Sequence, residues 1–187
     1  MRAPLLAPLL LLALARAVAA GDPDPMNDDP VRRLLTAEHR HVRPVDARLR
    51  GALEDGVRRS ATLAQLVRTL DQSDVIVYLE TVAGMHPSVA GRMILAGASA
   101  GPRYLRIQIA PRYRGDELTA LIGHELRHAL EVAQSPQVRD DASLLALYRT
   151  IGHSGGDTLG AGEGSHHRYD TMAARHTGRL VLTELRG

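Results

Sequence analysis

The sequence predicts an α+β fold, in which a small twisted sheet of about three strands packs on one long helix, with further N-terminal and C-terminal helices. Three short strand-like runs lie between residues 75 and 110, and a long helical pattern follows them. Shorter helical patterns flank this central part on both sides. The 187 residues, of which 44% are hydrophobic, suffice for a single domain with a core.

The first 20 residues are typical of a secretory signal peptide. Arg2 precedes an apolar run from Leu5 to Leu14, and the segment ends in small residues up to Ala20. We expect cleavage after Ala20 and a secreted or periplasmic protein, without stable membrane insertion once the segment is removed. The apolar run is short for a membrane span, although an uncleaved anchor is the alternative.

The charge of the predicted mature chain argues against nucleic acid as a partner. All 23 basic residues are arginines; Arg2 and Arg16 lie in the signal segment, which contains none of the 21 acidic residues. Removing the segment changes the formal net charge from +2 to zero, whereas nucleic-acid binding favours a concentrated basic patch. The chain has no cysteine, which excludes disulfides, thiolate metal ligands and cysteine nucleophiles.

The part between the signal segment and the folded domain is predicted to be a flexible lead-in. Residues 21–43 begin with a stretch rich in proline and aspartate, and a single domain is expected over residues 44–187. Pro44 is expected to open the first helix, with Val45 on its inner face. Thr62, followed three residues later by a glutamine, predicts the start of a second helix.

Three runs have the composition of β-strands. Residues 75–79 are continuously apolar and mostly β-branched, as in a strand buried on both faces. A second short strand is expected at residues 93–96, before a turn. Residues 104–110 alternate between polar and apolar side chains, as in a strand with one buried face. This third strand leads almost directly into the long helix.

The long helix carries the pattern that points to a function. Asp116 is an N-cap candidate, and Pro136 ends the helix. His124, Glu125 and His128 form an H-E-x-x-H pattern inside it. The two histidines share one helix face, on the flank of the apolar stripe, and can bind one metal ion at the rim of the core. Glu125 projects about 100° away and is free to face a water on that metal.

Two helices and a glycine-rich stretch follow. Asp140 or Asp141 is expected to cap a helix that ends near Gly152. Residues 152–168 hold six glycines and three histidines without periodicity, which fits either a loop at the site or a surface segment. Asp170 is expected at the start of the last helix.

The pattern indicates a catalytic metal, for which Zn²⁺ is the expected ion. A zinc ion with three protein ligands lowers the pKa of a water in its fourth position from near 16 to about 7. Glu125 is expected to accept a proton from that water and to return it to the leaving amine. This chemistry hydrolyses peptide bonds, so a peptide or protein is the expected substrate.

The third metal ligand is chosen on physical grounds. Glu131 shares the histidine face, but its Cα lies about 7 Å along the axis from their midpoint. It is therefore expected to orient His128 or an arginine instead. Asp170 comes from a distant segment and is the preferred ligand, with helix N-capping as its alternative role. The remaining candidates are Glu163, Asp141, His153, His166 and His167.

The motif at residues 124–128 resembles that of the zincin metallopeptidases, and the strands before a motif helix are similar to minimal gluzincin-type catalytic domains. The segment from Asp74 to Leu185 also resembles a group of uncharacterised secreted bacterial proteins. The resemblance implies a zinc-dependent peptidase in which the stretch 104–110 binds extended substrate by backbone pairing. It also implies a residue that polarises the scissile carbonyl, for which Tyr148 or a loop histidine is the candidate; Tyr148 could instead support the metal ligands.

The chain departs from two zincin subgroups. The metzincin pattern requires a glycine and a third histidine where this chain has Glu131 and Gln134. The Asn-Glu pair that thermolysin-like enzymes carry on a second helix is absent as well. The third ligand therefore cannot be carried over from either subgroup.

Two other functions are compatible with the sequence. A non-catalytic zincin-like protein, with or without metal, could serve as an interaction module of the cell envelope. Glu125 argues against this alternative, because a structural zinc site uses a fourth protein ligand and has no need of an acid there. A stand-alone inhibitor or regulatory domain that keeps only the fold is the third possibility. The sequence does not indicate an oligomeric state.

Overall fold

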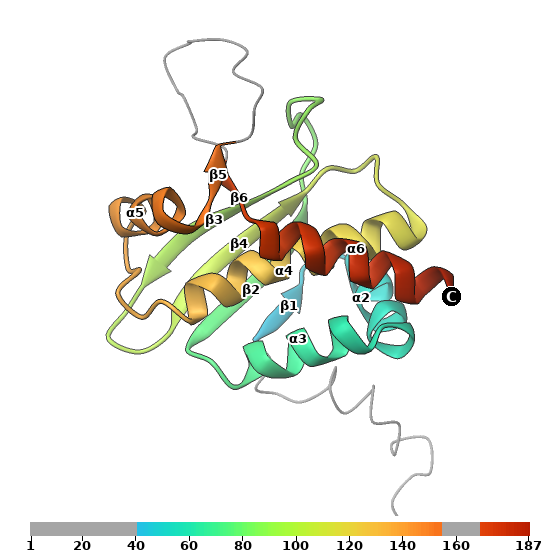
Figure 1. The fold of residues 1–187 in the computed structure, drawn as a ribbon, viewed down its shortest axis with the longest axis horizontal. Helices are drawn as coiled ribbons and strands as arrows, with labels where there is room; N and C mark the ends of the chain where they lie inside the picture. The colour runs from blue at the N-terminus through green and yellow to red at the C-terminus, as the bar shows by residue number, and fades with distance from the viewer. Residues whose placement is uncertain (1–40, 155–168) are drawn as a thin grey trace, which may run out of the picture.

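A four-stranded mixed sheet, a two-stranded ladder and five helices make up residues 41–154 and 169–187, the part of the chain that the computed structural model describes (Figure 1). The predicted α+β class is confirmed. In chain order the elements are β1 (Val42–Pro44), α2 (Ala47–Arg59), α3 (Ala61–Asp71), β2 (Val75–Thr81), β3 (Gly91–Ala98), β4 (Arg103–Ile109), α4 (Gly115–Ala133), α5 (Asp141–Ile151), β5 (His153–Ser154), β6 (Tyr169–Asp170) and α6 (Met172–Arg186).

The main sheet has the strand order β1-β2-β4-β3. Strands β1 and β4 run parallel to β2, whereas β3 is antiparallel to β4. Val77 of β2 lies beside Leu105 of β4, and both are fully buried on the helix-covered face. The predicted third strand is therefore β4, which has a strand on each side. Its backbone is already paired along both edges, so the expectation that residues 104–110 bind substrate by strand addition is wrong.

The sequence predicted neither strand β1 nor the short strands β5 and β6, and β1 displaces the start of the expected first helix. Pro44 is the last residue of this strand, so the predicted helix start at Pro44 is wrong. Helix α2 begins later because the side chain of Asp46 caps it, accepting a hydrogen bond from the backbone N–H of Leu49 at 2.9 Å. Val45 falls between the two elements and is 60% exposed, not turned inward as expected. Pairing with β2 decides this conformation, which local helix signals could not show.

The N-cap of helix α3 lies two residues before the predicted one. Ser60 is the N-cap, and its hydroxyl accepts a hydrogen bond from the N–H of Leu63 at 3.0 Å. The hydroxyl of Thr62 instead donates to Glu184 of α6 at 2.6 Å. The prediction of Thr62 as the cap is therefore wrong, and the residue joins α3 to the last helix.

Helix α4 spans the predicted length, and its two ends are stabilised differently. The prediction of Asp116 as the N-cap is wrong, because the helix begins at Gly115 and no side chain caps it. Asp116 and Glu117 instead lie in the first turn, where their charge is favourable to the helix dipole. At its end the fully buried Arg103 donates to backbone carbonyls and pairs with Asp74 at 2.6 Å. The acceptors of Arg103 in the chain around the helix end are the carbonyls of Val132, Ala133, Ser135 and Val138. The start of β4 thus fixes the end of α4.

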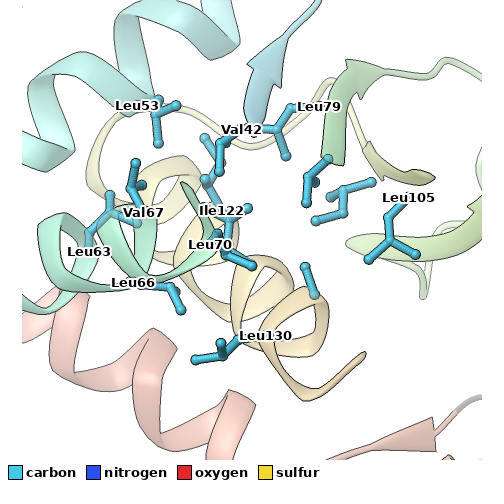
Figure 2. Packing of buried hydrophobic residues seen from close by; sticks show 14 of the residues in the cluster. Val42, Leu53, Leu63, Leu66, Val67, Leu70, Leu79, Leu105, Ile122 and Leu130 are labelled. Carbon is cyan, nitrogen blue, oxygen red and sulfur yellow. The ribbon is translucent and has the colours of Figure 1, made fainter. Parts of the chain in front are cut away.

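The hydrophobic core lies between the sheet and helices α2, α3 and α4. Figure 2 shows labelled apolar side chains from all three helices and from β1, β2 and β4 converging on one space. Ile122 of α4 and Leu105 of β4 are both fully buried there. The core holds one side of α4 firmly against the sheet and leaves its other side for α6 and the functional site.

Helix α6 packs closely against α4 because glycines stand at the contact. A Cβ on Gly123 would lie 2.9 Å from the side chain of Val181, and one on Gly178 would lie 3.2 Å from the Cβ of His124. Larger residues would push the helices apart. This contact sets the first turns of α6 beside the motif histidines (Figure 1). Within residues 41–154 and 169–187 no helix is long and apolar enough to cross a membrane.

Candidate metal centre

His124 and His128 lie one turn apart on α4, at the rim of the core. Their ring centroids are 5.0 Å apart. The side chain of His124 is 22% exposed and that of His128 is 8% exposed, so both are sheltered without being sealed from water. This position matches the expectation from the helical pattern.

Asp170 reaches the two histidines from the other end of the described chain. It lies in β6, which pairs with β5 so that Asp170 is opposite His153. The N-cap of α6 is Thr171, whose hydroxyl accepts a hydrogen bond from the N–H of Ala174 at 3.0 Å. Asp170 therefore does not cap the helix. Its Oδ1 lies 3.4 Å from Nε2 of His124 and 3.7 Å from Nε2 of His128.

These three side chains could hold a metal ion. One ligand atom from each of His124, His128 and Asp170 lies within 4.8 Å of the others. Tetrahedral zinc with bonds of about 2.0–2.2 Å separates its ligand atoms by roughly 3.3–3.6 Å. The two nitrogen–oxygen distances in the site are close to this value, and two imidazoles with one carboxylate are a usual donor set for zinc. The donor atoms and their spacing therefore fit the ion that the motif predicts.

Glu131 fixes the orientation of the His128 ring. Its Oε2 lies 2.9 Å from Nδ1 of His128, and its Oε1 accepts a hydrogen bond from Thr171 at 2.6 Å. With Nδ1 held by a carboxylate, Nε2 is the nitrogen directed at Asp170. Burial raises the pKa of Glu131, but hydrogen bonds from His128 and Thr171 outweigh this and lower it overall. Glu131 is thus an ionised support behind one candidate ligand.

The charges of the three candidate ligands are coupled. Burial lowers the pKa of His128, but the carboxylates of Asp170 and Glu131 raise it more strongly, to about 9. Burial and the neighbouring His128 lower the pKa of His124. Burial raises the pKa of Asp170, whereas His128 and Arg175 lower it far more. The carboxylate is therefore ionised at neutral pH, as a metal ligand must be.

Glu125 lies on the side of α4 that faces strand β3. Its carboxylate packs so closely on Gly91 that a Cβ there would fall 2.4 Å from Oε1. Any larger residue at this point would displace the carboxylate from its position. The residue is 5% exposed, and burial is the main cause that raises its pKa to about 7. A carboxyl group with this pKa can both accept and release a proton near neutral pH.

Tyr148 of α5 packs against His128. It is 7% exposed, and its ring contacts the His128 ring edge to face with centroids 5.5 Å apart. Its hydroxyl donates to the backbone carbonyl of His128 at 3.4 Å. Burial raises its pKa above the ordinary value, with Glu131 and Glu125 adding to the effect. Tyr148 of α5 thus supports the helix at the site.

Two of the other candidates for the third ligand, Asp141 and His153, lie in the described residues and are not part of the group that could hold a metal ion. Asp141 stands in the first turn of α5 and is exposed. The side chain of His153 is exposed, although its backbone pairs with that of Asp170. Glu163, His166 and His167 fall outside the described residues. Among residues 41–154 and 169–187, the group able to hold a metal is His124, His128 and Asp170.

Three residues at the site were missed by the sequence reasoning. Thr171 links the α6 cap to Glu131, Gly91 receives Glu125, and Arg175 donates from Nε to Oδ2 of Asp170 at 2.6 Å. The threonine beside Asp170 was a visible cap candidate, since threonine is also favoured at N-caps. No sequence pattern marks Gly91 or Arg175 as part of the site. Gly91 contacts Glu125, which is distant in sequence, and Arg175 binds Asp170, which lies outside its own helix.

Comparison with known proteins gives no relative: no family model, no curated protein and no solved structure matches the chain. The site is therefore interpreted from its own geometry and chemistry.

Proposed function

We propose that this protein is a zinc-dependent peptidase that acts outside the cytoplasm. The observation that carries the proposal is the triad of His124, His128 and Asp170, with the buried Glu125 on the same helix. A metal site used only for structure has no need of a buried acid beside it. The sequence motif and the converging side chains support the same reaction class.

His124 and His128 would hold the ion through Nε2, and Asp170 would supply a carboxylate oxygen. Bound zinc activates a water in its open fourth position and polarises a substrate carbonyl. Glu131 and Tyr148 keep His128 in place for this role, one at its ring nitrogen and one at its backbone carbonyl. Arg175 holds the outer oxygen of Asp170, so that the inner oxygen is presented to the histidines.

Glu125 is the group that moves the proton. It accepts a proton from the attacking water and delivers it to the amine nitrogen that leaves. Its pKa of about 7 is close to the value at which a carboxyl group performs both steps at neutral pH. Its contact with Gly91 fixes the carboxylate and limits the positions that it can adopt.

An extended peptide substrate can pair with strand β3. Strands β1 and β3 form the two edges of the four-stranded sheet, and β3 pairs only with β4 among the described strands. It begins at Gly91, which contacts Glu125, so its free edge starts next to the proposed general base. Strand addition supplies backbone hydrogen bonds to a peptide without requiring a deep pocket. This use of β3 replaces the role expected for residues 104–110.

The test combines metal content with hydrolysis. We expect the purified full-length protein to bind about one zinc per chain, measured by elemental mass spectrometry, because three ligands converge on one position. His124→Ala should lose that zinc. Glu125→Gln should retain it and lose hydrolysis of a quenched fluorescent peptide mixture by roughly 10²- to 10⁴-fold, the usual contribution of a general base.

The matched control is Glu117→Gln, which makes the same change at an exposed position of α4. It should leave both zinc content and hydrolysis unchanged. Zinc-loaded protein that cleaves no peptide would contradict the proposal and leave a non-catalytic metal-binding module. Equal activity of wild type and Glu125→Gln would refute the assigned role of Glu125.

A further inference from the structure

The exposed side chain of Arg175 places a positive charge beside the candidate metal centre. Its Nε donates to Oδ2 of Asp170, the carboxylate whose other oxygen faces the two histidines. The side chain is 45% exposed. Within the described part of the chain, the two terminal nitrogens of its guanidinium group make no hydrogen bond. Arginine presents its donors in a planar fork, and one edge of this fork is free.

The helix that carries Arg175 adds further positive charge on its exposed side. Arg179 follows one turn later and is exposed, and in the described residues its side chain has no partner. Gly178, between the two arginines, contacts His124, which ties this turn of α6 to the site. In Figure 1, α6 starts at β6 and runs along α4. The two arginines are therefore carried by the helix that borders the histidine face.

Apart from Asp170, which pairs with Arg175 through Nε only, the described carboxylates near these arginines have other partners. Glu184, the one acid on α6, accepts hydrogen bonds from Ser60 and Thr62 at the start of α3. Glu131 is occupied by His128 and Thr171. Asp170 satisfies one donor of Arg175 and is itself needed by the histidines. The guanidinium groups of α6 are thus available to a negatively charged partner.

We propose that the site selects acidic peptide segments, and that Arg175 binds a substrate carboxylate next to the scissile bond while Arg179 attracts a second one. The proposal rests on the proposed peptidase function and names its substrate class. An arginine fork binds a carboxylate with two parallel hydrogen bonds, which gives orientation as well as attraction. A neutral amide of the same shape offers only one acceptor oxygen and no charge.

The experiment measures binding without hydrolysis, so that it does not depend on turnover. A short fluorescein-labelled peptide rich in glutamate and its twin with glutamine at the same positions are titrated with zinc-loaded Glu125→Gln protein, by fluorescence anisotropy. We expect the glutamate peptide to bind roughly tenfold more tightly, the size of effect that a few partly exposed charge pairs produce together. Adding Arg175→Gln should reduce this preference to about twofold or less.

Arg175 also supports Asp170, so zinc content is measured for every variant at the protein concentration used. A role limited to positioning Asp170 would weaken zinc binding or lower the affinity for both peptides equally, which would overturn the proposal. Arg175→Lys keeps the charge but not the planar fork, so it should retain only part of the preference. Arg179→Gln, which touches none of the candidate ligands, should lower the preference by a smaller factor with full zinc content. Arg50→Gln, an exposed position on α2, is the control that should change nothing.

Failure of this proposal and failure of the proposed function give different results. If the protein hydrolyses peptides but binds both peptides equally, or if the preference survives Arg175→Gln, only the substrate class is wrong. If acidic peptides bind with the expected dependence on Arg175 but nothing is cleaved, the binding surface stands and the peptidase function falls.

Discussion

Helix α4 contacts two clusters of charged side chains that are built in opposite ways. At the C-terminal end of the helix, Arg103 is fully buried, and each of its guanidinium nitrogens donates to a carbonyl or to Asp74. On the exposed flank, His124, His128 and Asp170 direct ligand atoms at one shared position. The first cluster is complete with protein atoms alone. In the second cluster, Glu131 binds Nδ1 of His128 and Arg175 binds Oδ2 of Asp170. The Nε2 atoms of the two histidines and Oδ1 of Asp170 face one another.

This difference separates a cluster that is complete with protein atoms from one that could hold a metal ion. A buried charge contributes to a stable fold only when its hydrogen-bonding groups are satisfied, as those of Arg103 are. At the candidate metal centre, Oδ1 of Asp170 lies 3.4 Å and 3.7 Å from the two histidine nitrogens, and packing and outer hydrogen bonds hold these side chains there. At the metal centre the close contact of α6 on α4 and the Thr171 cap supply that support. Substitutions in the two clusters should therefore have separable effects.

The largest effect on stability is expected from Arg103→Met. It removes the donors to the end of α4 and leaves buried carbonyls unsatisfied, so the free energy of unfolding should fall by about 3 kcal/mol. Urea denaturation followed by circular dichroism measures it. Arg106→Met is the control on the same strand: Arg106 pairs with Glu80 at an exposed, solvent-screened position, so its loss should change the free energy of unfolding far less than the loss of Arg103. An equal decrease in the free energy of unfolding for the two variants would contradict the stabilising role of the buried cluster around Arg103.

An intermediate effect, confined to the metal, is expected from Glu131→Gln. The change weakens the support of His128 at Nδ1, so zinc affinity should fall by roughly ten- to a hundredfold, as is typical for groups behind a metal ligand. Competition with a chromogenic chelator measures the affinity, and urea denaturation should show little change. Glu117→Gln on the same helix is the control. Unchanged zinc affinity in Glu131→Gln would mean that packing alone orients His128.

The smallest effect is a pH-dependent loss of stability in Asp74→Asn. Hydrogen bonds from Arg103 hold the pKa of Asp74 below its ordinary value, so the ionised form stabilises the fold at pH above about 4. That contribution disappears as the pH falls through the lowered pKa. Because Asp74 is 40% exposed and screened by solvent, we expect a loss of only about 1 kcal/mol at pH 7. Denaturation at pH 7 and at pH 3 should show the difference from wild type shrinking at the lower pH; a constant difference would assign it to another cause.

The arrangement within α4 was determined by the sequence alone. A helix places residues four apart on one face, so His124 and His128 had to lie together, and Glu125 had to point elsewhere. The burial of Leu105, Ile107 and Ile109 in β4 and the capped helix α5, which begins after Asp140, followed from equally local patterns, whereas Gln108, expected on the polar face, is buried. These features depend on neighbours within one or two turns, which is the range over which backbone geometry fixes side-chain direction.

Contacts between distant segments were decided only by the tertiary structure. Glu131 and Thr171 are 40 residues apart, and their hydrogen bond, with the glycine contact of α6 on α4, brings Asp170 to the histidines. The sequence offered Asp170 as one candidate among several because it does not encode the distance between segments directly. Strand β1 and the interior position of β4 have the same origin, since pairing energy with another strand overrides weak local signals.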